Sequence, residues 1–349
     1  MGLTFAARVG GCLLGGALGD ALGAGVENMA WSAIADAYGP HGITSLPADA
    51  PFTDDTQMTL FTAEGLIRFR RRVEERGVCH PPSVVRHAYL RWLHTQGYPW
   101  FQVRSDFAFR DEPDGWLVND PRMHRRAGPG DTCIAALGNG GNGTVTEPIN
   151  ESVGCGGVMR VAPVGLVMPH PEGAYALGCD LAALTHGDPD GGWHPAGCLA
   201  AIISALVGGD EIGAAVERAV ALTSPHMAAI LTKAVRIGSA GTPTAELIEG
   251  QLGSGRHGDE ALAIAVACAL PTTDFATAVV AAANHSGDSD STAAICGNIL
   301  GAAHGVDALP QDWLDALDAR DIVATMADDI VRLVTHSPTD DWAQRYPPN

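Results

Sequence analysis

Apolar residues recur every three or four positions along most of this chain, which is the period of an amphipathic helix. Near the C-terminus Ile322, Met326 and Ile330 are each four residues apart, and another such segment begins near Thr53. Alternating apolar and polar residues, the pattern of a half-buried strand, are almost absent. The sequence therefore predicts an all-α fold. Further helices are expected at about 8–24, 82–96, 174–185, 195–207, 211–222, 227–238, 259–269, 275–284 and 292–303.

The segment 99–143 interrupts this pattern because it is rich in Pro, Gly and Asp. We expect a long irregular excursion there, with one short helix near 132–137. Long loops within a compact domain are often functional. No linker, break in composition or repeat of fixed period divides the chain, so a single domain over 1–349 is expected.

Four glycines share one face of the first predicted helix because they are spaced by four: Gly11, Gly15, Gly19 and Gly23. Each costs about 1 kcal/mol relative to alanine in a helix interior. A close approach of backbone must offset that cost. Ala294, Gly297 and Gly301 have a similar spacing in a later helix. Tight packing of these two helices is the favoured explanation, and contact with a ligand is the alternative.

The charge of the chain excludes some classes of partner. Its 349 residues contain 21 Lys and Arg against 40 Asp and Glu, a formal net charge of -19. Nonspecific binding to nucleic acid or to an anionic membrane relies on clustered basic side chains, so neither is expected. No uninterrupted apolar run reaches the roughly 18 residues that a membrane span needs, the longest candidate being 198–209. We expect a monomer whose partner is a small molecule or a modified protein.

The eight cysteines are scattered without a CxxC pair, in a chain too large to need disulfide bonds for stability. They are expected to be reduced, mostly buried thiols in a cytoplasmic protein. The segment 8–19 superficially resembles a signal peptide. Asp20 follows it at once, however, and its glycines weaken the apolar region.

The sharpest local motif is FTDDTQ, in which Thr53, Asp54 and Asp55 precede an amphipathic helix. Two neighbouring carboxylates converge on one object best at a helix N-terminus, where the backbone bends and the helix dipole favours ionised Asp. Taken alone, the motif is more often a helix cap followed by acids that compensate the dipole.

A second acidic motif, GDSDST, contains Asp288, Asp290 and Ser291 and also leads into a helix. Its hard oxygen atoms suit Mg²⁺, Mn²⁺ or Ca²⁺ better than zinc, although Asp-rich turns are common. If the two motifs met in space, their four Asp side chains would repel one another unless cations neutralised them. Two divalent ions between the motifs would do so.

Two further motifs suggest a binding site for an anion. In NESVGCGGVMR, Gly154, Gly156 and Gly157 could free successive backbone N–H groups to hold a diphosphate, although an ordinary glycine-rich turn is the simpler explanation. In LTHGDPDG, His186 lies two residues before Asp188. For such a His, a structural hydrogen bond is about as common as contact with a ligand.

With these motifs in order, the sequence resembles the ADP-ribosylglycohydrolase family. The matching segments are GCLLGGALGDALGAGVE (11–27), FTDDTQMTL (52–60), GCGGVMRVAPVGL (154–166), LTHGDP (184–189) and NHSGDSDSTAAICGNILGAAHG (284–305). The resemblance covers about 8–346. It implies a compact, single-domain orthogonal helix bundle that holds two Mg²⁺ or Mn²⁺ ions in a cleft for ADP-ribose.

The resemblance also implies roles for individual residues. Metal ligands would come from both acidic motifs: Thr53, Asp54, Asp55, Asp288, Asp290 and Ser291. The residues expected to contact the ADP moiety are Gly154, Cys155, Gly156, Gly157 and His186. Cys155 stands where the family often has Asn or Ser, so a role of its side chain is not expected. The residues expected to take part in catalysis are Glu27, Asp55 and Asp288, whereas Asp20 is interpreted as structural.

The implied reaction is hydrolysis of the bond at the anomeric carbon of the distal ribose, which releases ADP-ribose from a modified acceptor. The form of GDSDST resembles that of arginine-linked hydrolases somewhat more than that of serine-linked ones. O-acetyl-ADP-ribose and modified nucleobases remain open as substrates. Two other functions also remain open: a noncatalytic ADP-ribose-binding relative, and another magnesium-dependent hydrolase such as a phosphoesterase.

Overall fold

The computed structural model describes residues 2–104 and 111–347, and this part of the chain is built from helices. It contains no strand, only two isolated β-bridges, Ala50 with Leu317 and Gly154 with His257. The predicted all-α fold is therefore confirmed. Residues 105–110 of the excursion expected at 99–143 lie outside the described residues.

The first half of the chain forms helices that include the segments carrying FTDDTQ and the glycine-rich motif. They are α1 Phe5–Gly23, α2 Trp31–Tyr38, α3 Asp54–Arg76, α4 Pro81–Thr95, α5 Trp100–Val103, α6 Trp116–Asn119, η1 Pro121–His124, α7 Asp131–Gly138, η2 Cys155–Gly157, α8 Ala162–Val167 and α9 Pro171–Ala183. The excursion is thus less irregular than expected, because α5, α6 and η1 lie within it beside the predicted α7.

The second half of the chain also consists of helices. They are η3 Pro189–Trp193, α10 His194–Val207, α11 Ile212–Leu222, α12 Pro225–Gly238, α13 Ala245–Gln251, α14 Gly258–Ala269, α15 Phe275–Ala283, α16 Ser289–His304, η4 Val306–Ala308, α17 Gln311–Ala316, α18 Arg320–Val334 and α19 Trp342–Arg345. The nine helices that were predicted with bounds agree with the structure to within about three residues at either end. Helix α3 begins where expected, directly after Thr53, and α18 contains the predicted apolar stripe.

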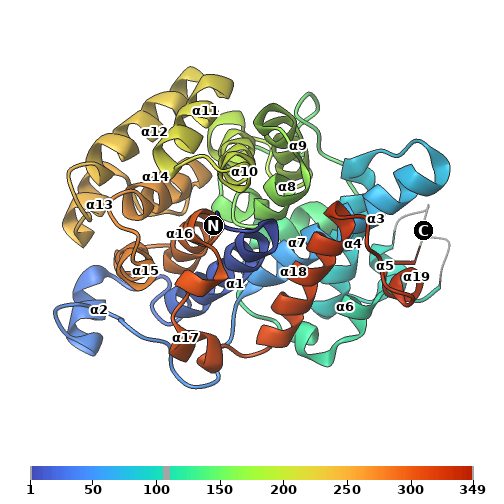
Figure 1. The fold of residues 1–349 in the computed structure, drawn as a ribbon, viewed down its shortest axis with the longest axis horizontal. Helices are drawn as coiled ribbons and strands as arrows, with labels where there is room; N and C mark the ends of the chain where they lie inside the picture. The colour runs from blue at the N-terminus through green and yellow to red at the C-terminus, as the bar shows by residue number, and fades with distance from the viewer. Residues whose placement is uncertain (1, 105–110, 348–349) are drawn as a thin grey trace.

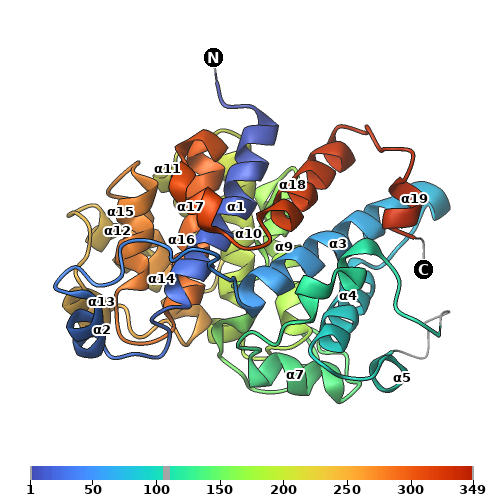
Figure 2. The same ribbon diagram turned by 90° about the horizontal axis from the view of Figure 1, so that it is seen from below.

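Helices α1 and α16 lie side by side near the middle of the molecule (Figures 1 and 2) and form its most extensive helix pair. The glycine face of α1 makes this possible. A Cβ atom added to Gly11 would lie 2.2 Å from the carbonyl oxygen of Gly301, and one on Gly15 would lie 2.5 Å from that of Gly297. Both distances are far shorter than van der Waals contact, so the predicted packing of these two helices is confirmed.

The central pair separates two groups of helices. Figure 1 shows α11 to α15 on one side, and α3, α4 and α18 on the other. The buried apolar residues of both groups form one continuous core with α1 and α16. The starts of α3 and α16 are held near each other because α1 packs against both helices.

By length and composition alone, helix α1 is long and apolar enough to cross a membrane. This was not expected from the sequence, because the helix contains no uninterrupted apolar run of about 18 residues. Most of the helix is nevertheless buried inside the protein. Because its glycine face is closed off by the backbone of α16, α1 has the environment of a core helix.

Candidate active site at two acidic helix starts

The starts of α3 and α16 open onto one pocket with a volume of about 200 Å³. Both acidic motifs contribute to its wall, which includes Asp54, Asp55, Asp288, Asp290 and Ser291. The structure therefore brings together two motifs that are more than 230 positions apart in the sequence. Glu27 also lines the pocket, as expected for the acid that ends the first glycine-rich motif.

Asp20, a residue of α1, fixes the start of α3. Its side chain is fully buried and accepts hydrogen bonds from the backbone N–H of Thr53 at 2.9 Å and from the N–H and hydroxyl of Thr56 at 3.0 and 2.5 Å. These contacts satisfy N–H groups that have no partner within the helix. Asp20 is therefore a structural link between α1 and α3, in agreement with the interpretation from sequence.

In the first acidic motif, Thr53 and the two Asp side chains have different surroundings. The Thr53 hydroxyl accepts a hydrogen bond from the N–H of Asp55 at 3.3 Å and caps α3. One oxygen of Asp54, Oδ2, accepts from the N–H of Gly130 at 3.2 Å. Asp55 Oδ1 is buried and has no hydrogen-bond partner among the described residues. Of the three predicted metal ligands here, Thr53 alone is not part of the pocket wall.

The second acidic motif meets the glycine-rich segment through a thiol. The Cys155 Sγ atom lies 3.0 Å from Asp288 Oδ2 and 3.6 Å from the Ser291 hydroxyl. The other oxygen of Asp288, Oδ1, is buried without a partner among the described residues. A side-chain role for Cys155 was not expected from the sequence, but its thiol is the group through which this segment contacts the acidic residues.

The electrostatics of the pocket are dominated by carboxylates. Burial raises the pKa of Asp54, Asp55 and Asp290 well above the usual value, and repulsion from neighbouring carboxylates raises it further. Burial and the nearby Asp288 also raise the pKa of Glu27. No Lys or Arg is among the described residues that line the pocket. The described wall of the pocket therefore contains several carboxyl groups and no Lys or Arg to pair with them.

Divalent cations fit this donor set. Carboxylate and hydroxyl oxygens are the ligands that Mg²⁺ and Mn²⁺ prefer, and the partnerless oxygens of Asp55 and Asp288 are available to bind them. Across 2–104 and 111–347, however, no three His, Cys, Asp or Glu side chains form a ready-made metal cluster. The fit rests on the chemistry of the donors and on their shared pocket.

Asp55→Asn is expected to stabilise the metal-free protein at pH 8 more than at pH 5. Burial and the neighbouring carboxylates raise the folded-state pKa of Asp55 well above its unfolded value, so ionisation of this group opposes folding increasingly as the pH rises. The gain at pH 8 should exceed that at pH 5 by about 1 kcal/mol or more, since one pKa unit corresponds to 1.36 kcal/mol. Urea unfolding of both proteins in EDTA at the two pH values measures this difference. An equal effect at both would contradict it.

The glycine-rich segment forms another wall of the pocket, but not entirely as expected. The N–H of Cys155 donates to the carbonyl oxygen of Arg256 at 3.0 Å, and that of Gly154 donates to the Ser152 hydroxyl at 3.3 Å. Two N–H groups of the predicted anion cradle therefore already have partners. None of the hydrogen bonds among the described residues uses the N–H of Gly156, which remains available.

Gly154 and Gly156 also leave room for the ring of His186. A Cβ atom on Gly156 would lie 3.2 Å from His186 Nε2, and one on Gly154 would lie 3.4 Å from the same atom. His186 lines the pocket beside these two glycines. Gly157 does not line it, because it packs against the backbone of Gly192.

Sequence reasoning missed the contribution of α7. Its N-terminal residues Asp131, Thr132 and Cys133 line the pocket together with Gly128 and Gly130 just before it. The short helix itself was predicted. No residue type within it indicated a site, apart from its place in a long excursion of the kind that is often functional.

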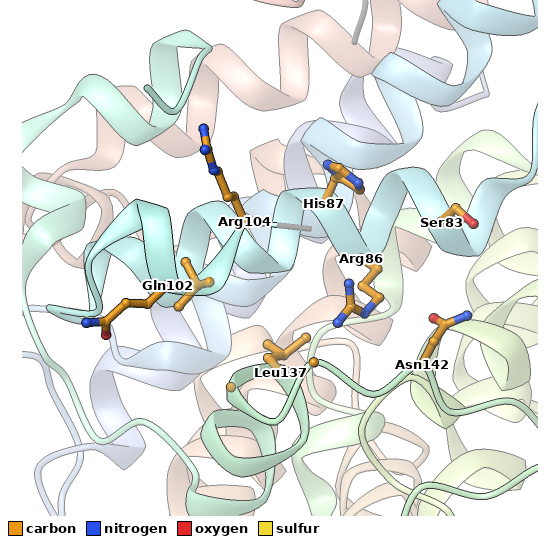
Figure 3. A pocket seen from close by; sticks show the side chains of 10 residues that line it. Ser83, Arg86, His87, Gln102, Arg104, Leu137 and Asn142 are labelled. Carbon is orange, nitrogen blue, oxygen red and sulfur yellow. The ribbon is translucent and has the colours of Figure 1, made fainter. Parts of the chain in front are cut away.

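Two wider cavities lie elsewhere and lack a comparable group of carboxylates. One of about 330 Å³, shown in Figure 3, lies where Arg86 of α4 faces Leu137 of α7, and no Asp or Glu is among the described residues that line it. The other, of about 480 Å³, has acidic residues, but Glu75 is paired there with Arg71 at 2.6 Å. The smaller acidic pocket is therefore the candidate active site.

Comparisons with known proteins agree with this assignment. A sequence model of the ADP-ribosylglycohydrolase family matches residues 1–340. The chain is similar to the ADP-ribosyl-(dinitrogen reductase) glycohydrolase of Rhodospirillum rubrum, with 27% identity over 323 residues, which cover 90% of this chain and 91% of that protein. It is also similar to the ADP-ribosylarginine hydrolase of Serratia proteamaculans (strain 568), with 25% identity over 95% of this chain and 80% of that protein.

The fold is similar as well. A solved structure of an ADP-ribosylglycohydrolase-related protein complex superposes with a TM-score of 0.64 and 25% sequence identity, over 95% of this chain and 99% of that one. The match of the family over nearly the whole sequence and the shared all-α fold lead to one conclusion. This chain belongs to the ADP-ribosylglycohydrolase family and is a hydrolase of glycosyl bonds.

Proposed function

We propose that this chain cleaves the glycosidic bond at the anomeric carbon of the distal ribose in an ADP-ribosylated substrate and releases ADP-ribose. The observation that carries the proposal is the convergence of both acidic helix starts, the glycine-rich segment and His186 on one pocket. The two acidic helix starts supply carboxylates for a sugar and its cations. The glycine-rich segment and His186 supply neutral hydrogen-bond donors for a diphosphate.

The cations would be two Mg²⁺ or Mn²⁺ ions held by Asp54, Asp55, Asp288, Asp290 and Ser291. Thr53 would add only the lone pair that its capping role leaves free. The chemistry such ions supply is Lewis-acid polarisation of ribose hydroxyls and of a water molecule. Asp55 and Asp288 each have a buried oxygen atom that has no hydrogen-bond partner among the described residues and could bind such an ion.

Glu27 is the proposed general acid. Its side chain is partly buried and lines the pocket, and its raised pKa keeps a proton available at a higher pH than an ordinary Glu would. A proton from Glu27 would go to the leaving nitrogen or oxygen of the acceptor. Positive charge that develops on the ribose would be stabilised by the surrounding Asp carboxylates, as in other glycosyl transfers with an oxocarbenium-like transition state.

An arginine-linked substrate fits the site best. A guanidinium leaving group is cationic, and a pocket with carboxylate walls attracts such a group. One relative carries a name that agrees with this chemistry, the ADP-ribosylarginine hydrolase of Serratia proteamaculans.

The test is an assay of ADP-ribose release from arginine-, serine- and nucleotide-linked substrates in Mg²⁺, Mn²⁺ or EDTA. We expect intact ADP-ribose from the arginine-linked substrate with either metal, and loss of release in EDTA. Mass spectrometry of the product separates the other functions. Release of phosphate would indicate a phosphoesterase, and binding of ADP-ribose without turnover would indicate a noncatalytic reader.

A further inference from the structure

Arg160 lies behind the glycine-rich segment and has unusual surroundings for a charged residue. Its side chain is fully buried, and its hydrogen bonds go to neutral groups. One nitrogen, Nη1, contacts Cys133 Sγ at 3.3 Å, while Nη2 donates to the Thr185 hydroxyl at 2.7 Å. The guanidinium also stacks over the ring of Tyr89, 4.4 Å from its centroid. No described carboxylate is paired with this buried charge, so the charge acts on the neutral groups around it.

Thr185 connects Arg160 to the pocket. Its hydroxyl oxygen lies 2.8 Å from Nδ1 of His186, the ring beside Gly154 and Gly156. Arginine only donates hydrogen bonds, so this oxygen accepts from Arg160 and has a single hydrogen of its own to give. That hydrogen can go to His186 Nδ1, to the carbonyl oxygen of Ala182, which is 3.5 Å away, or to the sulfur of Cys133, which also interacts with Thr185.

The carbonyl of Ala182 is the poorer acceptor. It already accepts the backbone N–H of Thr185 at 3.0 Å and that of His186 at 2.9 Å, which uses both of its lone pairs. The sulfur of Cys133 is only a weak acceptor, so we infer that the Thr185 hydroxyl donates to His186 Nδ1. A neutral imidazole that accepts at Nδ1 must carry its hydrogen on Nε2, and Nε2 is the ring atom that faces the two glycines.

We propose that Arg160 and Thr185 are positioning residues that hold His186 in the Nε2–H tautomer, so that the ring donates a hydrogen bond to a diphosphate oxygen of the ligand. The identity of this ligand rests on the proposed function, whereas the tautomer does not. The arrangement explains how a pocket can recognise an anion although no Lys or Arg is among the described residues of its wall. Arg160, which carries the positive charge, does not line the pocket. The neutral Nε2–H group of His186 makes the contact with the anion.

The chain of hydrogen bonds from Arg160 through Thr185 to His186, hereafter the relay, also keeps the Nε2–H donor of His186 unchanged as the pH varies. Burial and the neighbouring Arg160 lower the pKa of His186 to about 3, so the ring stays neutral throughout the physiological range. The hydrogen bond to the ligand should therefore not change as pH falls from 8 to 5, whereas an ordinary His would become charged near pH 6.5.

The tautomer can be read in the ligand-free protein from long-range ¹H–¹⁵N NMR spectra of the histidine rings, with His186→Gln used to assign the signal. Wild type should show the Nε2–H form at pH 7. Thr185→Val keeps the shape of the side chain but removes the hydroxyl, and should allow the Nδ1–H form to appear. Thr185→Ser should restore the wild-type spectrum. Retention of the Nε2–H form in Thr185→Val, or a charged ring in wild type, would overturn the proposal.

Calorimetric titration with ADP-ribose gives the second readout. Thr185→Val should bind about tenfold more weakly, which corresponds to about 1.4 kcal/mol, and Thr185→Ser should bind nearly as wild type does. The matched control is Thr95→Val, which removes a buried hydroxyl that donates to Trp92 at 2.7 Å on α4, away from the pocket. Equal weakening by the control would show a general loss of packing and overturn the relay. If the tautomers behave as expected but wild type does not bind ADP-ribose, the proposed function fails and the relay stands.

Discussion

Asp288→Ala is expected to reduce the release of ADP-ribose by about 100- to 1,000-fold, the scale at which removal of one preorganised charge-stabilising group acts on a transition state. Within the part of the chain that the structure describes, Asp288 Oδ1 is buried without a hydrogen-bond partner, and Asp288 lines the pocket together with the first acidic motif. It makes no side-chain capping bond to α16, so that helix should persist without it. The variant should therefore lose catalytic activity while it stays folded, and the loss is measured as kcat/KM on an arginine-linked substrate.

Stability provides the control for this variant. Thermal unfolding in EDTA should show Asp288→Ala at least as stable as wild type, because one of several mutually repelling carboxylates has been removed. Added Mg²⁺ should raise the Tm of wild type and have much less effect on the variant. Asp312→Ala, which removes an exposed acid from the first turn of α17, should leave release unchanged. Undiminished release by Asp288→Ala would sink the assignment of this pocket.

Gly11→Ala is expected to destabilise the protein by about 3 kcal/mol, the upper part of the usual range for overpacking. The new Cβ would lie 2.2 Å from the carbonyl oxygen of Gly301 and 2.7 Å from the carbonyl carbon of Gly305. Both neighbours are backbone atoms, so α1 and α16 would have to separate. Because Asp20 on α1 orders the start of α3, ADP-ribose release should fall as well.

The neighbouring residue gives a matched control. A Cβ on Gly10 would lie 3.7 Å from the nearest heavy atom, a side-chain carbon of Val306, which is ordinary contact. Gly10→Ala should therefore be neutral or stabilise the protein by up to about 1 kcal/mol through helix propensity. Denaturant unfolding of both variants measures the difference. If Gly11→Ala were as stable as Gly10→Ala, the close packing of α1 on α16 could not be the reason for the glycine face.

The helices that could be predicted are those with several turns and one buried face. In α18, Ile322, Met326 and Ile330 are buried at the expected spacing. Helix α2 was missed because only Ile34 is buried along its eight residues, so it has no apolar stripe. Helix α13 was missed because seven residues make fewer than two turns, too few for a period to be recognised.

The candidate site was predicted in part for a similar reason. Acidic residues at a helix start form a local pattern, and both motifs do begin helices. The contacts that combine them into a site are distant in sequence. Cys155 is 133 positions from Asp288, and Gly130 is 76 from Asp54. Arg160 stands within an otherwise apolar segment, where nothing local indicated that it would be buried beside Thr185.

The sequence by itself determined the all-α fold, the longer helices, the two acidic helix starts and the glycine face that brings α1 against α16. Periodicity and helix-start chemistry act over a few residues, so these features can be read locally. Only the tertiary structure decided that Thr53 caps α3 outside the pocket wall, that the N–H groups of Gly154 and Cys155 are already bonded, and that Arg160 lies behind His186. Each of these depends on which distant groups the packed helices bring within hydrogen-bond distance, and a local pattern does not encode that.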